Sequence, residues 1–182
     1  AMYVVDSPSA AGDLRRMRFV VSAFDVRAIG NGDNPTGSYG YKFPRLSNHY
    51  FNMTLLINER DIVYNCEIRT SGSPWTRGGG LDRGKFKLPK DQLFRGKEKL
   101  MYDNDAGGGS RHHNRITRYW LYLLGHPVNE NEYILTEVNN GGSALREEVE
   151  PLGNDLLDRN FENGSQGELY RIDDEWWFQD NW

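Results

Sequence analysis

The stretch HYFNMTLLINERDIVYNCEIR, residues 49–69, decides the fold that we expect. Apolar and polar residues alternate on both sides of Asn58-Glu59-Arg60-Asp61, and this is the period of a strand with one buried face. The four residues between the two runs are typical of a turn. We therefore predict a β-hairpin with these apolar side chains on its buried faces: Phe51, Met53, Leu55 and Ile57 on the first strand, and Ile62, Tyr64, Cys66 and Ile68 on the second.

Similar patterns predict further strands on both sides of this hairpin. Asn139-Asn140-Gly141-Gly142 is a strong hairpin turn. The chain from 28 to 46 is rich in Gly, Asn and Pro and is predicted to be a long loop. The predicted strands are 17–24, 85–88, 132–138, 145–149 and a closing hairpin of 168–172 and 176–178.

Two helices are predicted between the strands. The first runs from about 111 to 124, with Ile116, Trp120 and Leu123 at helical spacing, Ser110 as its N-cap and Gly125 as its stop. The second runs from about 155 to 161. The expected fold class is α+β, with antiparallel hairpins and two helices.

One domain is expected from 17 to 182, after an irregular lead-in over 1–16. Ala1-Met2 at its start is typical of a cloning remnant. Hydrophobic residues are 37 % of the 182, and aromatic residues, at 13 %, give the expected core much of its buried area. Cys66 is the sole cysteine, which excludes a disulfide framework, and it is predicted to be a small core residue.

The charge balance argues against nucleic acid as a partner. The 22 basic and 26 acidic residues leave a net charge of −4, whereas nucleic-acid binding favours a concentrated basic surface. No apolar run is long enough to span a membrane, so no membrane span is expected. His112-His113 are adjacent and so lack the spacing of a helical zinc pair, and we assign no metal site.

Glycine-rich segments and a basic strand are the candidates for a phosphate-binding site. Gly78-Gly79-Gly80 precedes Arg83, Lys85 and Lys87, and in phosphoryl transfer a strand lysine neutralises nucleotide phosphates. A solvated strand surface explains the same residues. Glu147-Glu148 could anchor such a lysine, or they could belong to a charged edge strand.

The order of motifs from about 50 to 175 resembles the CotH family of spore-coat protein kinases. Arg69-Thr70-Ser71-Gly72-Ser73 is followed by Gly84-Lys85-Phe86-Lys87-Leu88 and by a helix ending in Leu124-Gly125. An Asn140-Gly141 hairpin then leads to Glu147-Glu148, and Gly167-Glu168-Leu169-Tyr170 closes the series. The resemblance implies that the fold is part of an atypical protein-kinase-like domain.

The resemblance also implies a function: the nucleotide-binding side of a bacterial, secreted or cell-surface transferase that uses ATP and Mg²⁺ to phosphorylate a protein substrate. The family's catalytic Asp and Asn residues are expected downstream of Trp182, so the chain alone is expected not to transfer phosphate. Either lysine and either glutamate could form the nucleotide-site pair, which we expect to face each other across a cleft. The implied cofactor-binding residues are Arg69, Arg83, Lys85, Lys87, Glu147 and Glu148.

Two other hypotheses remain open at this point. The chain could be a non-enzymatic extracellular module that binds protein or carbohydrate, or a pseudokinase used as a scaffold. Trp176, Trp177, Phe178 and Trp182 cluster near the C-terminus, and alternation cannot bury all of them on one face. We therefore predict that Trp177 or Trp182 forms an exposed apolar patch or mediates self-association.

Overall fold

A computed structural model describes residues 14–31, 47–72, 80–104 and 112–170. The chain divides into two compact units, Ala1–Pro151 and Leu152–Trp182, and each is described here by itself.

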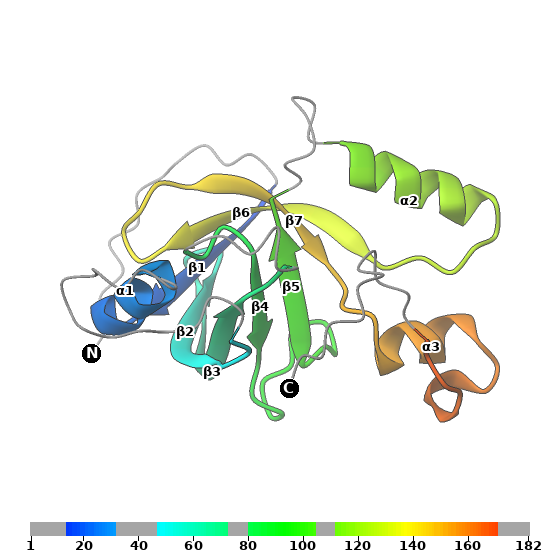
Figure 1. The fold of residues 1–182 in the computed structure, drawn as a ribbon, viewed down its shortest axis with the longest axis horizontal. Helices are drawn as coiled ribbons and strands as arrows, with labels where there is room; N and C mark the ends of the chain where they lie inside the picture. The colour runs from blue at the N-terminus through cyan, green and yellow to red at the C-terminus, as the bar shows by residue number, and fades with distance from the viewer. Residues whose placement is uncertain (1–13, 32–46, 73–79, 105–111, 171–182) are drawn as a thin grey trace. The chain divides into compact units, whose positions relative to one another are not determined.

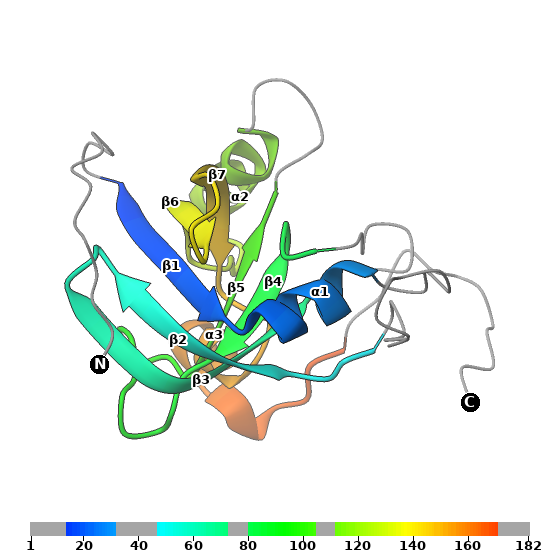
Figure 2. The same cartoon turned by 90° about the vertical axis from the view of Figure 1, so that its left-hand side faces the viewer.

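The first unit is built around a closed β-barrel (Figures 1 and 2). Its strands follow the order β1-β2-β3-β4-β5-β7-β6, and β6 returns to pair with β1. The β1–β6 pair is parallel and all the others are antiparallel. The strands are β1 (Arg15–Val21), β2 (Phe51–Ile57), β3 (Asp61–Thr70), β4 (Gly84–Lys87), β5 (Lys99–Asp103), β6 (Asn131–Val138) and β7 (Ala144–Val149).

The expected α+β class, resembling part of a protein-kinase-like domain, is therefore wrong. The predicted hairpins around Asn58 and Asn139 do form, but both are parts of one seven-stranded mixed barrel, accompanied by three short helices in the described residues. Closure removes the two sheet edges that separate hairpins would leave open. The pairing responsible, β1 with β6, joins residues more than 100 positions apart, and no local pattern indicates it.

Two asparagines in hairpin turns hold β1 in place. Asn58 and Asn139 both adopt positive φ, 53° and 54°, as hairpin turns require. Asn58 donates its backbone N–H to the Arg16 carbonyl and accepts the Arg16 N–H on its side chain. Asn139 makes the equivalent contacts with Phe19 and Val21. The predicted turns thus also fix the first strand between its two neighbours.

A bulge in β3 changes the predicted face of the central hairpin. Asn65 has a φ of 57°, and the register shifts so that Val63 pairs with Leu55. Val63 packs against the core, whereas Ile62 and Tyr64 are 36 % and 50 % exposed. The prediction that Ile62 and Tyr64 share the buried face is wrong for this reason.

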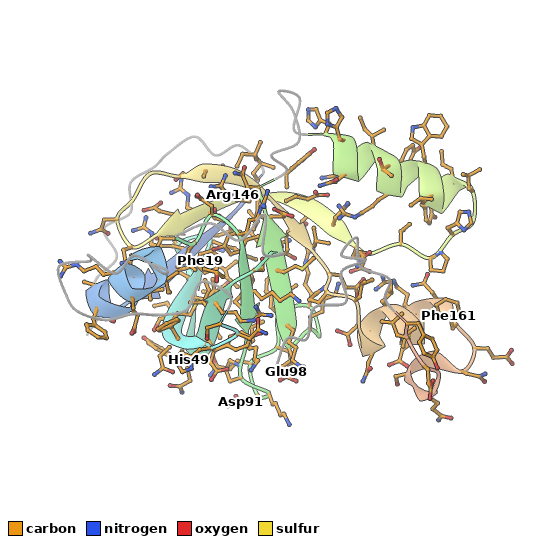
Figure 3. The ribbon with its side chains drawn as sticks, in the orientation of Figure 1. Phe19, His49, Asp91, Glu98, Arg146 and Phe161 are labelled. Atoms are coloured by element: carbon orange, nitrogen blue, oxygen red, sulfur yellow. The ribbon has the colours of Figure 1, made fainter. Side chains whose placement is uncertain are left out.

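Aromatic side chains fill the centre of the barrel. Phe19 stacks on Tyr102 with ring centres 5.1 Å apart, and Phe86 lies 5.4 Å from Phe19 (Figure 3). The buried Tyr102 hydroxyl donates to the Leu81 carbonyl at 2.8 Å. A Cβ atom on Gly84 would lie only 2.6 Å from the Tyr102 ring, so this position requires glycine. The predicted aromatic core is confirmed in these residues.

A helix not predicted from the sequence follows β1. Helix α1 (Ala23–Asn31) begins after Ser22, whose hydroxyl accepts the Asp25 backbone N–H and donates to the Asp25 carboxylate. Its residues Ala28 and Ile29 pack in a second buried cluster with Phe51. The Ser22-x-x-Asp25 spacing was the available signal for this helix.

Helix α2 (His113–Leu123) matches the first predicted helix, but it begins after His112, and the predicted N-cap Ser110 lies outside the described residues. Gly125, with a φ of 78°, ends it as expected, and its N–H bonds to the Tyr122 carbonyl. None of the helices in the described residues is long and apolar enough to cross a membrane.

The second unit contains the short helix α3 (Asn154–Asn160) and the 3₁₀ turn η1 (Gly164–Gln166). The Asp158 carboxylate accepts the Ser165 backbone N–H and ties the two together. Residues 168–170 form no strand. The rest of the predicted closing hairpin, including Trp177 and Trp182, lies outside the described residues.

Candidate functional site

Several side chains predicted for nucleotide binding lie together on the outer surface of the barrel. Phe86 is fully buried, so Lys85 and Lys87 on either side of it point outward. Arg69 of β3 lies directly opposite Lys85. Arg83, just before β4, continues the same outward row, because its carbonyl still bonds to the β3 side at Ser71.

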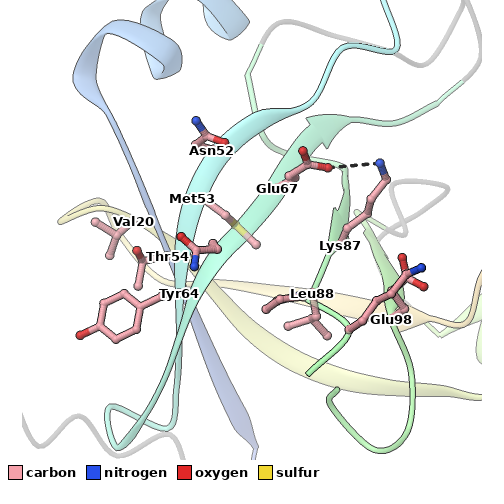
Figure 4. Close-up of a pocket in the computed structure, with 12 residues that line it drawn as sticks. Val20, Asn52, Met53, Thr54, Tyr64, Glu67, Lys87, Leu88 and Glu98 are labelled. Atoms are coloured by element: carbon pink, nitrogen blue, oxygen red, sulfur yellow. Dashed lines mark hydrogen bonds and ion pairs between the residues drawn. The ribbon is translucent and has the colours of Figure 1, made fainter. Parts of the chain in front are cut away.

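Lys87 is engaged by a second group of residues. Its ammonium lies 3.1 Å from the Glu67 carboxylate and 3.9 Å from the centre of the Tyr50 ring. Both Lys87 and Glu67 line an open groove of about 630 Å³ on the outside of β2, β3 and β4 (Figure 4). Lys87 is therefore held in place by a carboxylate and an aromatic face.

Glu147 lies in a row of charged residues that runs from Arg83, just before β4, across β5 and β7 to α2. Its cross-strand neighbour on β5 is Asp103, which forms an ion pair of 2.6 Å with Arg83. On its other side, Glu147 accepts from Arg118 of α2 at 2.6 Å and from Asn131 at 2.8 Å. We call Arg83, Asp103, Glu147 and Arg118 the charge row.

Glu148 lies on the opposite face of β7. It is the cross-strand neighbour of the buried Tyr102 and accepts from Arg15 at 3.2 Å. Burial raises the pKa of Glu148, an effect opposed by the Arg15 guanidinium and reinforced by the nearby Glu132 carboxylate. Arg15 also forms an ion pair with Glu132, so one guanidinium neutralises two carboxylates.

The structure thus places the two candidate glutamates on opposite faces of β7. It also shows different surroundings for the two candidate lysines. Lys85 and Glu147 share the outer face, with β5 between them: Met101 is opposite Lys85 and Asp103 is opposite Glu147. Glu148 faces away from both lysines. A direct Lys85–Glu147 pair across a cleft, as the sequence predicts, would have to span β5.

Sequence reasoning did not assign a site role to Asp103, Arg118 or Asn131. Asp103 follows Leu100 and Tyr102 on a strand that was not predicted, although the alternation of these two residues was a usable signal. Arg118 lies three residues after Arg115, which places both arginines on one side of α2. No local signal connects Asn131 to Glu147, because they meet only through the β6–β7 register.

A second cavity, of about 390 Å³, lies beside α2. Its lining combines four cations and four carboxylates with two tyrosines of the helix. Among the described residues, no group of three or more His, Cys, Asp or Glu side chains is arranged to hold a metal ion. The charged and aromatic residues that line the cavity are Arg95, Lys97, Arg115, Arg118, Tyr119, Tyr122, Glu130, Glu132, Glu148 and Glu150.

No protein-family model matches the chain, and no curated protein matches it either. The resemblance to CotH kinases therefore stays a prediction that rests on the ordered motifs.

Proposed function

We propose that the outer face of β3, β4, β5 and β7 binds the triphosphate of a nucleotide, as part of an ATP-dependent protein phosphotransferase. The observation that carries the proposal is that Arg69 and Lys85 lie on the same face as Arg83, the first residue of the charge row. The proposal depends on these side chains and not on a kinase-like fold, because one chemistry recurs on unrelated folds.

The cations suit a polyphosphate better than a single carboxylate. Arg69 and Lys85 are direct cross-strand neighbours, so their charged groups can converge on one anion. Arginine binds phosphate oxygens through two parallel N–H bonds, and lysine supplies a compact charge. Arg83 is paired with Asp103, and an incoming phosphate would compete with that carboxylate for it.

Asp103 and Glu147 are the residues that fit Mg²⁺, the metal that accompanies ATP. Mg²⁺ bound to a nucleotide usually takes one or two carboxylates and completes its shell with phosphate oxygens and water. These two carboxylates are adjacent in register, and a bound ion would compete for them with Arg83 and Arg118, which pair with them in this structure. When bound, the ion would neutralise phosphate charge. This chain's residues would hold and orient it.

Calorimetric titration with ATP, with and without Mg²⁺, tests the proposal directly. We expect Lys85→Met to weaken ATP binding roughly 10- to 100-fold, the usual value of a charge-assisted contact. Lys90→Met is the matched control, because Lys90 lies beyond the end of β4 and is not a register neighbour of Arg69. Glu147→Gln should reduce the gain in affinity that Mg²⁺ provides.

Two results would reject the proposal. One is the absence of ATP binding at millimolar concentration in the folded chain. The other is an equal loss of affinity in the Lys85 and Lys90 variants, since that would show only a general effect of net charge.

The second candidate function is carbohydrate binding by a non-enzymatic module. The groove of Figure 4 supports it: the half-exposed Tyr64 lines it together with Asn52, Thr54 and Asn65, so an aromatic ring and hydrogen-bonding side chains share one groove. Screening oligosaccharides against the wild type and Tyr64→Ala distinguishes the two candidates. Sugar binding lost in Tyr64→Ala, together with no ATP binding, would favour this module.

A further inference from the structure

Helix α2 exposes an unusual amount of apolar surface. None of its residues is buried. Four side chains, which we call the α2 stripe, are each more than half exposed: Ile116 (51 %), Trp120 (61 %), Leu123 (55 %) and Leu124 (71 %).

Helix α2 directs its charged side toward the barrel and its apolar side away from it, which is the reverse of an ordinary surface helix. Its arginines turn toward the barrel, where Arg118 pairs with Glu147 and Arg115 lies 4.7 Å from the centre of the Tyr133 ring. Residues spaced by three to four lie on one side of a helix, so the α2 stripe is on the side away from these contacts. Side chains project from both sides of α2 in Figure 3. A surface helix normally directs its apolar stripe toward its own core.

We propose that the α2 stripe pairs with the α2 stripe of a second copy of this chain, with the two helices antiparallel about a twofold axis. This proposal does not depend on nucleotide binding, because the residues involved face away from the charge row.

The charge distribution of α2 favours a second copy in this orientation. The stripe carries no charged residue, so two stripes can meet without burying like charges. The helix has no acidic residue in its first turn and no basic residue in its last, so its own side chains leave the helix dipole uncompensated. An antiparallel partner brings His113 and the positive helix start beside the negative helix end of the other copy.

The exposed area predicts a weak dimer. An aromatic side chain buries about 150–250 Å², the three aliphatic side chains of the stripe bury less, and all four are already partly covered, so two copies would bury at most about 1,000 Å² in total. That is close to the lower limit for a specific interface. We therefore expect a dimer that dissociates on dilution, with a dissociation constant on the order of 10–100 µM.

Sedimentation velocity of the full chain over roughly 1 µM to 1 mM tests the proposal. We expect a concentration-dependent dimer in the wild type and only monomer in Trp120→Glu, which would bury two carboxylates near the twofold axis. Tyr64→Glu is the control, because Tyr64 is also half exposed but lies on β3. We expect this variant to dimerise with the same dissociation constant as the wild type. Circular dichroism confirms that each variant is folded.

Paired charges test the antiparallel orientation. In that arrangement, Ile116 of one copy lies opposite Leu124 of the other. Ile116→Lys and Leu124→Glu should each weaken the dimer, and the double variant should recover it. A wild type that is monomeric throughout, or a dimer that survives Trp120→Glu, overturns the proposal. A monomer that instead binds lipid vesicles through Trp120 overturns it as well and assigns the stripe to a membrane surface.

Discussion

Large apolar side chains are buried in the barrel interior but exposed on helix α2. In the barrel, Phe19, Phe86 and Tyr102 are fully buried against one another. On α2, Trp120 and Leu124 are 61 % and 71 % exposed, although the helix is as regular as the strands. The comparison shows that an apolar pattern identifies the apolar face of a helix or strand. It does not show whether that face is buried by other residues of the same chain.

The two regions also differ in how they use charge. Inside the barrel, the Arg15 guanidinium neutralises two carboxylates, Glu132 and Glu148. On α2, Arg118 reaches back to the outer face of the barrel and pairs with Glu147. The charged side of the helix is therefore the side that attaches it, and this attachment leaves the apolar side free for another contact.

The largest expected difference in unfolding free energy is between Phe19→Ala and Trp120→Ala. Phe19 lies between two aromatic rings in a closed barrel, so its truncation leaves a cavity and should cost about 3–5 kcal/mol of unfolding free energy. Trp120 is 61 % exposed on the surface of α2, so its truncation should change stability by less than about 0.5 kcal/mol. Urea unfolding at low protein concentration measures both. Similar losses would contradict the comparison.

Gly84→Ala should cause the next largest loss of stability. The new methyl group would meet the Tyr102 ring at 2.6 Å inside a packed core, and overpacking of this kind costs about 1–3 kcal/mol. Gly142→Ala is the matched control, because no heavy atom lies within 4 Å of its Cβ position. Thermal unfolding of the two variants compares them. An unchanged melting temperature for Gly84→Ala would show that Tyr102 can move aside.

Glu148→Gln should have a smaller effect that depends on pH. Burial raises the folded-state pKa of Glu148 above its unfolded value, so the wild type keeps the full contribution of this group at low pH and loses it as pH rises through the folded pKa. The stability of Glu148→Gln relative to the wild type should therefore increase as pH rises above the ordinary glutamate value of about 4.3. Denaturant unfolding at a series of pH values above it measures the difference.

The exposed Glu162 provides the control for this pH dependence. Glu162→Gln makes the same chemical change at an exposed position, so the effect specific to Glu148 is the difference between the two variants. If the stability of Glu148→Gln instead falls relative to the wild type as pH rises, the ion pair with Arg15 outweighs the cost of burial.

Much of the local structure could be predicted from the sequence. The hairpin turns at Asn58 and Asn139 and the helix stop at Gly125 have strong residue preferences and were placed correctly. Helix α1 was missed because residues 17–24 were interpreted as one β-rich run, although the polar Ser22 separates Val21 from Ala23 and Phe24. The bulge at Asn65 was missed because it needs one residue at positive φ, which asparagine permits but does not require.

The candidate site was predictable only in part. The basic row of β4 and the adjacent glutamates stand out in the sequence, but the choice between Glu147 and Glu148 depends on which one is level with Tyr102 of β5. A strand register decides that choice, and shifting it by one residue would exchange the two faces. The charge row needs contacts from four separate elements, which no local spacing encodes.

The sequence by itself determined the short-range features of this protein: the alternation of the strands, the turn residues and the apolar stripe of α2. These depend on residue preferences within a few positions of one another. Only the tertiary structure decided the closure of the barrel through the parallel β1–β6 pair, the opposite faces of Glu147 and Glu148, and the outward direction of the stripe. The physical reason is that pairing between distant strands is selected by the packing of the whole core and not by any one segment.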